Sequence, residues 1–166
     1  MSEPKIEQLI INSPYTEPES FWKYNRDSKK FERVKGRRPS GYFIAKSRTK
    51  GAKKDLNYDD EGIFISIDLV NEIRPRVRSW RESGWPGITN TTRKLLTHWH
   101  DKGMRAFPFF FCQLDAIETL IWLNETREGR SVLIQDDGSK FRRLCTKLCT
   151  GGGKTIVMAM LIALQV

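Results

Sequence analysis

The amino-acid sequence of 166 residues predicts an α/β fold, and three features of its pattern carry that prediction. Two short segments between residues 41 and 68 have the apolar alternation that is typical of strands. From residue 69 to 125 the apolar spacing lengthens to that of helices. Residues 141–165 then place a glycine-rich turn between two apolar segments, which is the pattern of a strand, a turn and a helix. The hydrophobic content of 39% is enough for a core.

The first part of the chain predicts an irregular arm followed by two strands. Four prolines punctuate residues 1–40, so we expect this segment to be irregular, with a short helical stretch near Ser20–Tyr24. Strands are expected at Gly41–Lys46 and at Gly62–Asp68, where isoleucines alternate with other side chains. The basic segment Ser47–Lys54 is expected to form the exposed connection between them.

The later segments predict helices joined by turns. A helix is expected at Leu69–Glu82, interrupted early by Pro75, because proline removes a backbone donor and clashes with the preceding turn. Apolar spacing and glycine punctuation predict a break at 83–87, a helix at Thr89–His100, a loop at 101–108, a helix at Gln113–Glu125 and a turn at Asp136–Ser139. The last segments are expected to be a strand at Phe141–Cys149, a glycine turn at Thr150–Gly153 and a helix at Lys154–Gln165.

The chain is basic, and its charge is concentrated in one segment. Its 29 lysines and arginines exceed the 20 acidic residues, and between Lys23 and Lys54 there are 13 basic residues against Asp27 and Glu32 alone. Such an excess suits DNA, whose phosphates attract lysine and arginine whatever the base sequence. The alternative is a solvated basic face that binds no nucleic acid. The residues that we predict to contact DNA are Lys29, Lys30, Arg37 and Arg38.

Cysteine usage and hydropathy predict a cytoplasmic protein with no membrane partner. The three cysteines, Cys112, Cys145 and Cys149, are odd in number and lack a C-x-x-C spacing, so reduced thiols are expected rather than disulfides or a zinc site. The N-terminus lacks the charged and apolar regions of an export signal. The longest apolar run, Ile156–Leu164, has nine residues, whereas a membrane span needs about 20.

The most informative motif lies between the expected last strand and helix and reads Leu-Cys-Thr-Gly-Gly-Gly-Lys-Thr over residues 148–155. A phosphate-binding loop needs glycines so that backbone N–H groups can curl around phosphates. It also needs a lysine for the outer phosphates and a following hydroxyl that reaches Mg²⁺. Thr150–Thr155 therefore predict a site for ATP and Mg²⁺, although the strict pattern has glycine where Leu148 stands. The alternative is a surface glycine-rich turn before a helix.

A second segment predicts adenine recognition. Phe107, Phe109, Phe110 and Phe111 precede Gln113. An aromatic ring can stack on adenine, and a glutamine amide can both donate and accept at the N6 and N7 edge of adenine. Taken alone, phenylalanines clustered before a helix are more typical of a core. In combination with the phosphate loop, the pattern favours adenine binding by Gln113.

Two segments resemble the start of the DEAD/DEAH-box helicase family, and specifically the restriction (Res) subunits of type III restriction-modification enzymes. They read Phe-Phe-Cys-Gln-Leu-Asp-Ala-Ile-Glu-Thr-Leu-Ile-Trp-Leu at 110–123 and Leu-Cys-Thr-Gly-Gly-Gly-Lys-Thr-Ile-Val-Met-Ala-Met at 148–160. Loops of such helicases often spell Thr-Gly-x-Gly-Lys-Thr, as residues 150–155 do. Gly152 stands where relatives frequently have serine. The likeness covers almost the whole chain, but only these two segments are chemically diagnostic.

The resemblance implies a basic accessory region over residues 1–105 and an incomplete RecA-like ATP-binding domain over residues 106–166. It implies that Gln113 reads adenine, that Lys154 contacts the β and γ phosphates, and that the Thr155 hydroxyl helps to hold Mg²⁺. Thr150, Gly151, Gly152 and Gly153 would complete the phosphate loop. The parent activity would be ATP hydrolysis coupled to movement on double-stranded DNA, with a DNA methyltransferase subunit as a candidate partner.

The motifs that complete such a motor are expected after Val166: the Asp-Glu pair that completes magnesium coordination and activates water, the arginine fingers and the second lobe. We therefore interpret the chain as the truncated N-terminal part of an ATP-dependent DNA helicase or translocase. No catalytic residue is assigned, and no ATP turnover is expected from this chain alone. The alternative is a non-enzymatic DNA-binding or adaptor protein that retains the loop as a remnant.

Overall fold

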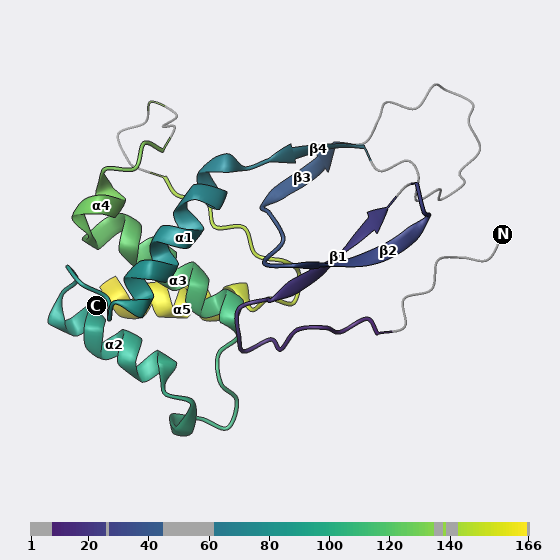
Figure 1. Ribbon diagram of the computed structural model, residues 1–166. Helices are drawn as coiled ribbons and strands as arrows, with labels where there is room; N and C mark the ends of the chain where they lie inside the picture. The colour runs from purple at the N-terminus through teal and green to yellow at the C-terminus, as the bar shows by residue number, and fades with distance from the viewer. Residues whose placement is uncertain (1–7, 26, 45–61, 135–137, 139–142, 166) are drawn as a thin grey trace. The chain divides into compact units, whose positions relative to one another are not determined.

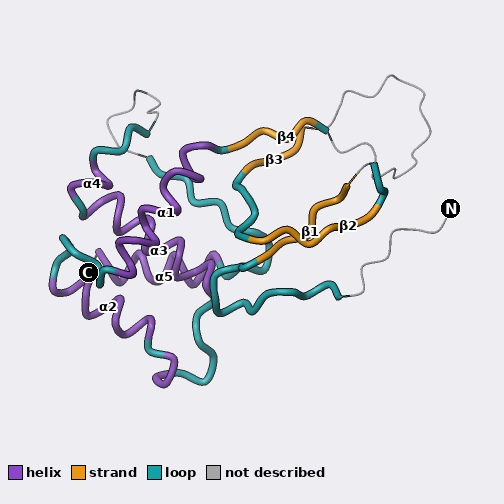
Figure 2. Tube along the Cα trace, in the orientation of Figure 1, coloured by secondary structure: helices purple, strands orange, loops and turns teal. Residues whose placement is uncertain are grey.

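The computed structural model is a mixed α/β fold, as predicted from the sequence, and its sheets are small and antiparallel. It describes residues 8–25, 27–44, 62–134, 138 and 143–165 (Figure 1). Within these residues there are two sheets, each of two strands. Figure 2 separates the strands from the helices by colour.

The chain divides into two compact units. Unit 1 comprises Met1–Ser13 and Glu17–Glu72, and unit 2 comprises Pro14–Thr16 and Ile73–Val166. All strands of the described residues belong to unit 1, and α2 to α5 belong to unit 2. The functional boundary predicted at residue 105 stays a prediction.

An antiparallel hairpin of β1 (Ser20–Asn25) and β2 (Lys30–Lys35) is the first element of unit 1. Its turn is stabilised by the Asn25 side chain, whose oxygen accepts from the backbone N–H groups of Asp27 and Ser28 at 2.9 and 3.2 Å. Asparagine favours such turns because its short amide can replace a backbone acceptor. The turn reverses the chain and lets the two strands pair along their whole length.

The hairpin corrects two expectations. The helical stretch expected near Ser20–Tyr24 is wrong, because these residues form ladder bonds with the next strand of the hairpin instead of helical bonds with one another. Residues 1–40 are likewise not irregular throughout. Asn12 ties the preceding arm to β1, since its amide nitrogen donates to the Ser20 carbonyl at 2.8 Å and its oxygen accepts from the Ser20 N–H at 3.3 Å.

The two strands expected next are confirmed in their described parts. β3 (Gly41–Ile44) pairs antiparallel with β4 (Ile63–Ser66). Phe43 and Phe64 lie directly opposite each other, with ring centroids 5.1 Å apart. The second strand ends earlier than expected because α1 begins at Asp68. The expected connection Ser47–Lys54 lies outside the described residues.

Helix α1 (Asp68–Glu82) runs through Pro75 without a break, so the expected interruption is wrong. Pro75 lies on the exposed side of the helix, where water can satisfy the carbonyl that loses its donor. The opposite side buries Ile73, Val77 and Trp80. Burying three large apolar side chains contributes about 1.5–3 kcal/mol each, which outweighs the cost of about 3 kcal/mol for an interior proline.

Unit 2 contains the three helices predicted at Thr89–His100, Gln113–Glu125 and Lys154–Gln165, together with two short helices that the sequence pattern did not predict, η2 within the expected loop 101–108 and α4. Thr89 caps the first of them, because its hydroxyl accepts from the Thr92 N–H at 3.1 Å. The helices are α2 (Asn90–His100), the short 3₁₀ helix η2 (Lys102–Met104), α3 (Phe111–Glu125), α4 (Arg127–Arg130) and α5 (Lys154–Gln165). Among the described helices, none combines the length and the apolar composition needed to cross a bilayer.

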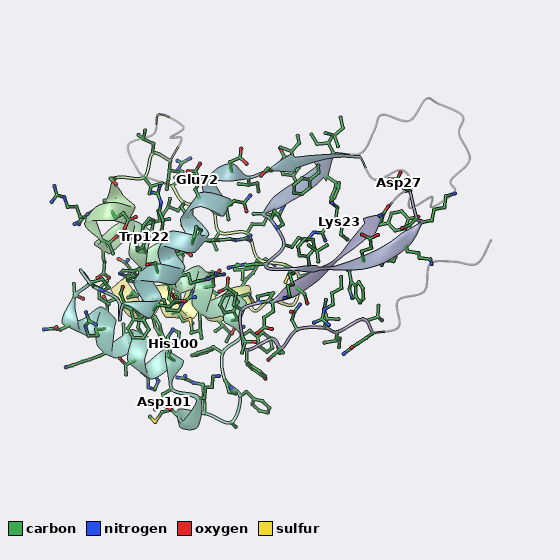
Figure 3. The ribbon with its side chains drawn as sticks, in the orientation of Figure 1. Lys23, Asp27, Glu72, His100, Asp101 and Trp122 are labelled. Atoms are coloured by element: carbon green, nitrogen blue, oxygen red, sulfur yellow. The ribbon has the colours of Figure 1, made fainter. Side chains whose placement is uncertain are left out.

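Helix α3 is the centre of the core of unit 2. It contacts both α4 and α5, and α5 lies beside it in Figure 1. Ile117 and Trp122 of α3 are fully buried, and α5 buries Val157 and Met160. Figure 3 labels Trp122 on α3 and His100 on α2 among these helices. The interior is therefore built by helices rather than by a sheet.

The strand expected at Phe141–Cys149 is wrong for its described part. Residues 143–149 have no regular secondary structure. A strand is stable only when a neighbour satisfies its backbone groups, and the described residues offer no strand beside this segment. The glycine turn Thr150–Gly153 and the helix after it form nevertheless, because both depend on local backbone bonds.

Candidate functional site

The glycine turn that the sequence singles out depends on glycine at two of its positions. Gly151 and Gly153 have φ angles of 78° and 77°, in the left-handed region that favours glycine. The Gly152 N–H donates to the Cys149 carbonyl at 3.1 Å and closes the turn. Helix α5 then begins at once, since the Ile156 N–H donates to the Gly153 carbonyl at 3.0 Å. The motif is thus a tight turn that opens directly into a helix.

Gln113 and the loop meet, although 39 residues separate Gln113 from Gly152 in the chain. The Gln113 amide nitrogen donates to the Gly152 carbonyl at 3.3 Å, and its oxygen accepts from the Phe110 N–H at 3.0 Å. The second bond caps the start of α3, which explains why that helix begins at Phe111. Gln113 is only 6% exposed, so its amide has one fixed orientation.

Gly153 is required by this contact as well as by its own backbone. A Cβ atom at this position would collide with the Gln113 amide nitrogen. Gly151 has nearly the same φ, yet nothing lies within 4 Å of the corresponding Cβ position. The close approach between α3 and the loop therefore depends on the absence of a side chain at Gly153 and not at Gly151.

Two donors of the loop bond to one carbonyl of its own backbone, and this conformation is called the closed form below. The Lys154 ammonium donates to the Cys149 carbonyl at 3.0 Å, and the Gly152 N–H donates to the same oxygen. Lys154 and Thr155 are exposed on the first turn of α5. A phosphate would have to replace the Cys149 carbonyl as the acceptor of both donors.

The phenylalanines before α3 differ in burial, so that some match the core interpretation and one matches the stacking interpretation. Phe110 is half-buried against Tyr15, with ring centroids 5.7 Å apart, and the Arg105 guanidinium lies 4.3 Å from the centroid of Phe109. Phe107 is 84% exposed, which leaves its ring accessible for stacking. Tyr15 was missed by the sequence pattern, because it comes from a segment about 95 positions earlier.

A buried ionic cluster around Glu118 was also missed. The Glu118 side chain is fully buried and accepts from Arg81 Nε at 2.6 Å, from Trp85 Nε1 at 2.9 Å and, through a bond with His100 Nε2, at 2.9 Å. Asp115 lies 2.9 Å from the other end of the same guanidinium. Burial lowers the pKa of Arg81, but the two carboxylates outweigh it and hold that pKa above its ordinary value.

This cluster holds helices together rather than offering a reactive group. Each oxygen of Glu118 has a hydrogen-bond partner, and the residue is 0% exposed, so solvent does not reach the carboxylate. Arg81 comes from α1 and His100 from α2, and both converge on α3. A signal in the sequence is that the acidic residue Glu118 directly follows Ile117, on the apolar face of the helix.

The four basic residues predicted to contact DNA lie at two ends of the β1–β2 hairpin. Lys29 and Lys30 are exposed at its turn. Arg37 and Arg38 follow the other end of β2; Arg37 lies 3.6 Å from Glu17, and Arg38 is exposed beside the Phe43 ring at 6.0 Å. A strand of six residues is about 20 Å long. The two pairs of basic residues therefore lie at separate places on the hairpin and do not form one patch.

A groove of about 570 Å³ adjoins the second pair. Arg37 and Arg38 line it together with Trp22, and the N-terminal arm around Ile10 supplies the opposite wall. This groove belongs to unit 1, whereas the glycine turn belongs to unit 2.

No protein family, curated protein or solved structure matches this chain. The geometry of Gln113, Gly152 and Lys154 is accordingly the principal evidence on what the chain binds.

Proposed function

We propose that residues 106–166 carry the adenine- and phosphate-binding elements of an ATP-dependent DNA helicase or translocase. The observation that supports this proposal is the contact between the Gln113 amide and the Gly152 carbonyl at 3.3 Å. The packing of α3 against α5 brings this buried glutamine and the glycine turn together across 39 residues. A nucleotide would use both groups at once, with its base at the amide and its phosphates at the turn.

The residues present fit ATP with Mg²⁺. Each contact of Gln113 uses one N–H or one lone pair of the amide, which leaves one N–H and one lone pair for the edge of adenine. Lys154 would neutralise the outer phosphates, and Thr155 would reach Mg²⁺ through its hydroxyl. Thr150, Gly151, Gly152 and Gly153 would donate N–H groups, aided by the positive end of α5. Bound ATP supplies a γ phosphate whose hydrolysis can drive movement on DNA.

The type of helicase, its substrate and its partner are part of the same proposal. The segments around Gln113 and Lys154 support a RecA-like ATP-binding region of the type III restriction (Res) kind, preceded by a basic accessory region over residues 1–105. Double-stranded DNA is the proposed substrate track, and a DNA methyltransferase subunit is the proposed partner. The opening strand of a RecA-like sheet is the part of this proposal that residues 143–149 do not support.

ATP binding by the purified chain tests the proposal. We expect weak, saturable binding of ATP with Mg²⁺ and no hydrolysis above background. Lys154→Ala should weaken binding by roughly 10- to 100-fold, because a hydrogen bond to a charged group contributes about 1.5–3 kcal/mol. Isothermal titration calorimetry measures the affinity, and release of inorganic phosphate measures turnover.

The matched control is Lys147→Ala, which removes an exposed lysine from the irregular segment just before the loop. Its affinity for ATP should equal that of the unchanged chain. If both substitutions weakened ATP binding equally, the loss would be explained by net charge alone, and the phosphate loop would lose its support. Turnover that disappears with Lys154→Ala would show that a full catalytic set is present.

DNA binding should depend steeply on salt if the basic residues of unit 1 contact phosphates. Each neutralised phosphate adds about 0.9 to the slope of the log affinity against log salt. Replacing Lys29, Lys30, Arg37 and Arg38 by serine should lower that slope by up to about 3.6. Fluorescence anisotropy with a labelled duplex at several salt concentrations measures it.

The matched control removes the same charge from exposed positions of unit 2. It replaces Lys94, Lys102, Arg127 and Arg130 by serine. An equal loss of slope in both variants would assign the effect to net charge alone. The exposure of Lys29, Lys30 and Arg38 favours, as a second candidate function, DNA binding without a motor. Salt-dependent DNA binding together with no detectable ATP binding would select that second candidate.

A further inference from the structure

Two of the three cysteines meet at the same residue of the glycine turn. The Cys112 thiol donates to the Gly152 carbonyl, with the sulfur 3.7 Å from the oxygen. The Cys149 sulfur lies beside the same residue, 3.1 Å from where a Cβ atom of Gly152 would be. Gly152 therefore has both sulfurs beside it, although 37 positions separate the two cysteines.

The surroundings of the two thiols differ. Cys149 is exposed, whereas Cys112 is half-buried in the first turn of α3. Burial raises the pKa of the Cys112 thiol, and the neighbouring Cys149 raises it further. The backbone around Cys149 is irregular, so no helix or ladder bonds hold it in a fixed register. Cys149 is thus the thiol that solvent reaches first and the one whose backbone can adjust.

We propose that Cys112 and Cys149 are a redox-sensitive thiol pair whose disulfide locks the glycine turn in its closed form. The effect of the lock on ATP rests on the proposed function, whereas the disulfide itself does not. Cys145, which is exposed four residues before Cys149, lies outside the pair.

Hydrogen peroxide is the oxidant class that the chemistry requires. The Cys149 thiolate attacks one peroxide oxygen, the O–O bond breaks, and sulfenic acid and hydroxide are formed. The Cys112 thiolate then attacks the Cys149 sulfur, the S–O bond breaks and hydroxide leaves. The protons of the two thiols end in water, so that two thiols and one peroxide give one disulfide and two water molecules.

The hydrogen bonds of the closed form explain how the disulfide would hinder ATP binding. The Cys149 carbonyl holds the Gly152 N–H and the Lys154 ammonium, which are the two donors that a phosphate needs. A disulfide would tether Cys149 to α3 and keep this carbonyl over the turn. Because ligand affinity falls in proportion to the population of the competent form, the oxidised chain should bind ATP roughly tenfold or more weakly.

Tryptic cleavage separates the three cysteines and makes the disulfide directly measurable. Cys112 falls in peptide 106–127, Cys145 in 144–147 and Cys149 in 148–154. The full chain is reduced, treated with hydrogen peroxide, alkylated and digested for mass spectrometry. We expect 106–127 linked to 148–154, with Cys145 alkylated. No link, or a dominant link through 144–147, would overturn the pair.

Amide hydrogen exchange without nucleotide tests the lock independently of ATP. Exchange at Gly152–Val157 should be slower in the oxidised chain and should recover with a phosphine reductant. Cys145→Ser should behave like the unchanged chain, whereas Cys112→Ser and Cys149→Ser should show no slowing. Equal exchange in oxidised and reduced chains would overturn the lock.

Calorimetry with ATP completes the test. Binding that weakens on oxidation and recovers on reduction supports the lock, and equal affinity of the two forms overturns it. A reduced chain that binds no ATP counts against the proposed function alone, since peptide mapping and amide exchange still decide on the thiol pair.

Discussion

Replacing Glu118 by alanine is expected to lower the free energy of unfolding by about 3–5 kcal/mol, because the substitution leaves a buried cation with too few acceptors. The Glu118 side chain is fully buried, and that of Arg81 is only 19% exposed. Arg81 would keep Asp115 as its partner, but Trp85 and His100 would each lose their acceptor. Such a loss is a large fraction of the stability of a small domain.

Urea denaturation measures the change, read as a shift of the midpoint at constant slope. Glu118→Gln should cost less, because the amide oxygen still accepts while the charge is lost. The matched control is Glu128→Ala, which removes a carboxylate that is 60% exposed and 4.0 Å from Arg76. An exposed pair contributes about 0–1 kcal/mol. Similar losses for Glu118→Ala and Glu128→Ala would contradict a desolvated cluster.

Replacing Gly153 by alanine is expected to separate α3 from the glycine turn. The new Cβ atom would collide with the Gln113 amide, and the residue would keep a φ of 77° that alanine disfavours. We expect the stability to fall by about 1–3 kcal/mol and ATP affinity to fall by roughly tenfold or more. The physical reason is that the amide and the loop carbonyl can no longer occupy their present positions together.

Gly151→Ala separates the two causes. Gly151 has a φ of 78° but open space at its Cβ position, so this variant carries only the backbone strain of about 1–2 kcal/mol. The side-chain amide resonance of Gln113, followed by NMR, should shift strongly in Gly153→Ala and little in Gly151→Ala. Equal shifts in the two variants would show that the amide does not lie against Gly153.

Local sequence patterns predicted α1, α2, α3 and α5, whereas η2 and α4 were not expected. The apolar spacing of 113–125 and the turn 150–153 each act within a few residues, so their bonds can be inferred from neighbours in the chain. The same reasoning failed for Ser20–Tyr24 and for residues 143–149. Strand formation depends on a partner elsewhere in the chain, and the sequence pattern does not identify that partner.

Within the candidate site, the sequence by itself determined the chemical groups: the Gln113 amide, the glycines of the turn, and the amine and hydroxyl of Lys154 and Thr155. Only the tertiary structure decided that Gln113 bonds to Gly152 and that the Cys149 carbonyl occupies the donors of the loop. The sequence also did not determine that Glu118 is buried and bonded to Arg81, Trp85 and His100. Residue type and local period are properties of neighbouring positions, whereas the contacts of Gln113 and Glu118 join α3 to segments 18 to 39 positions away, and packing selects them.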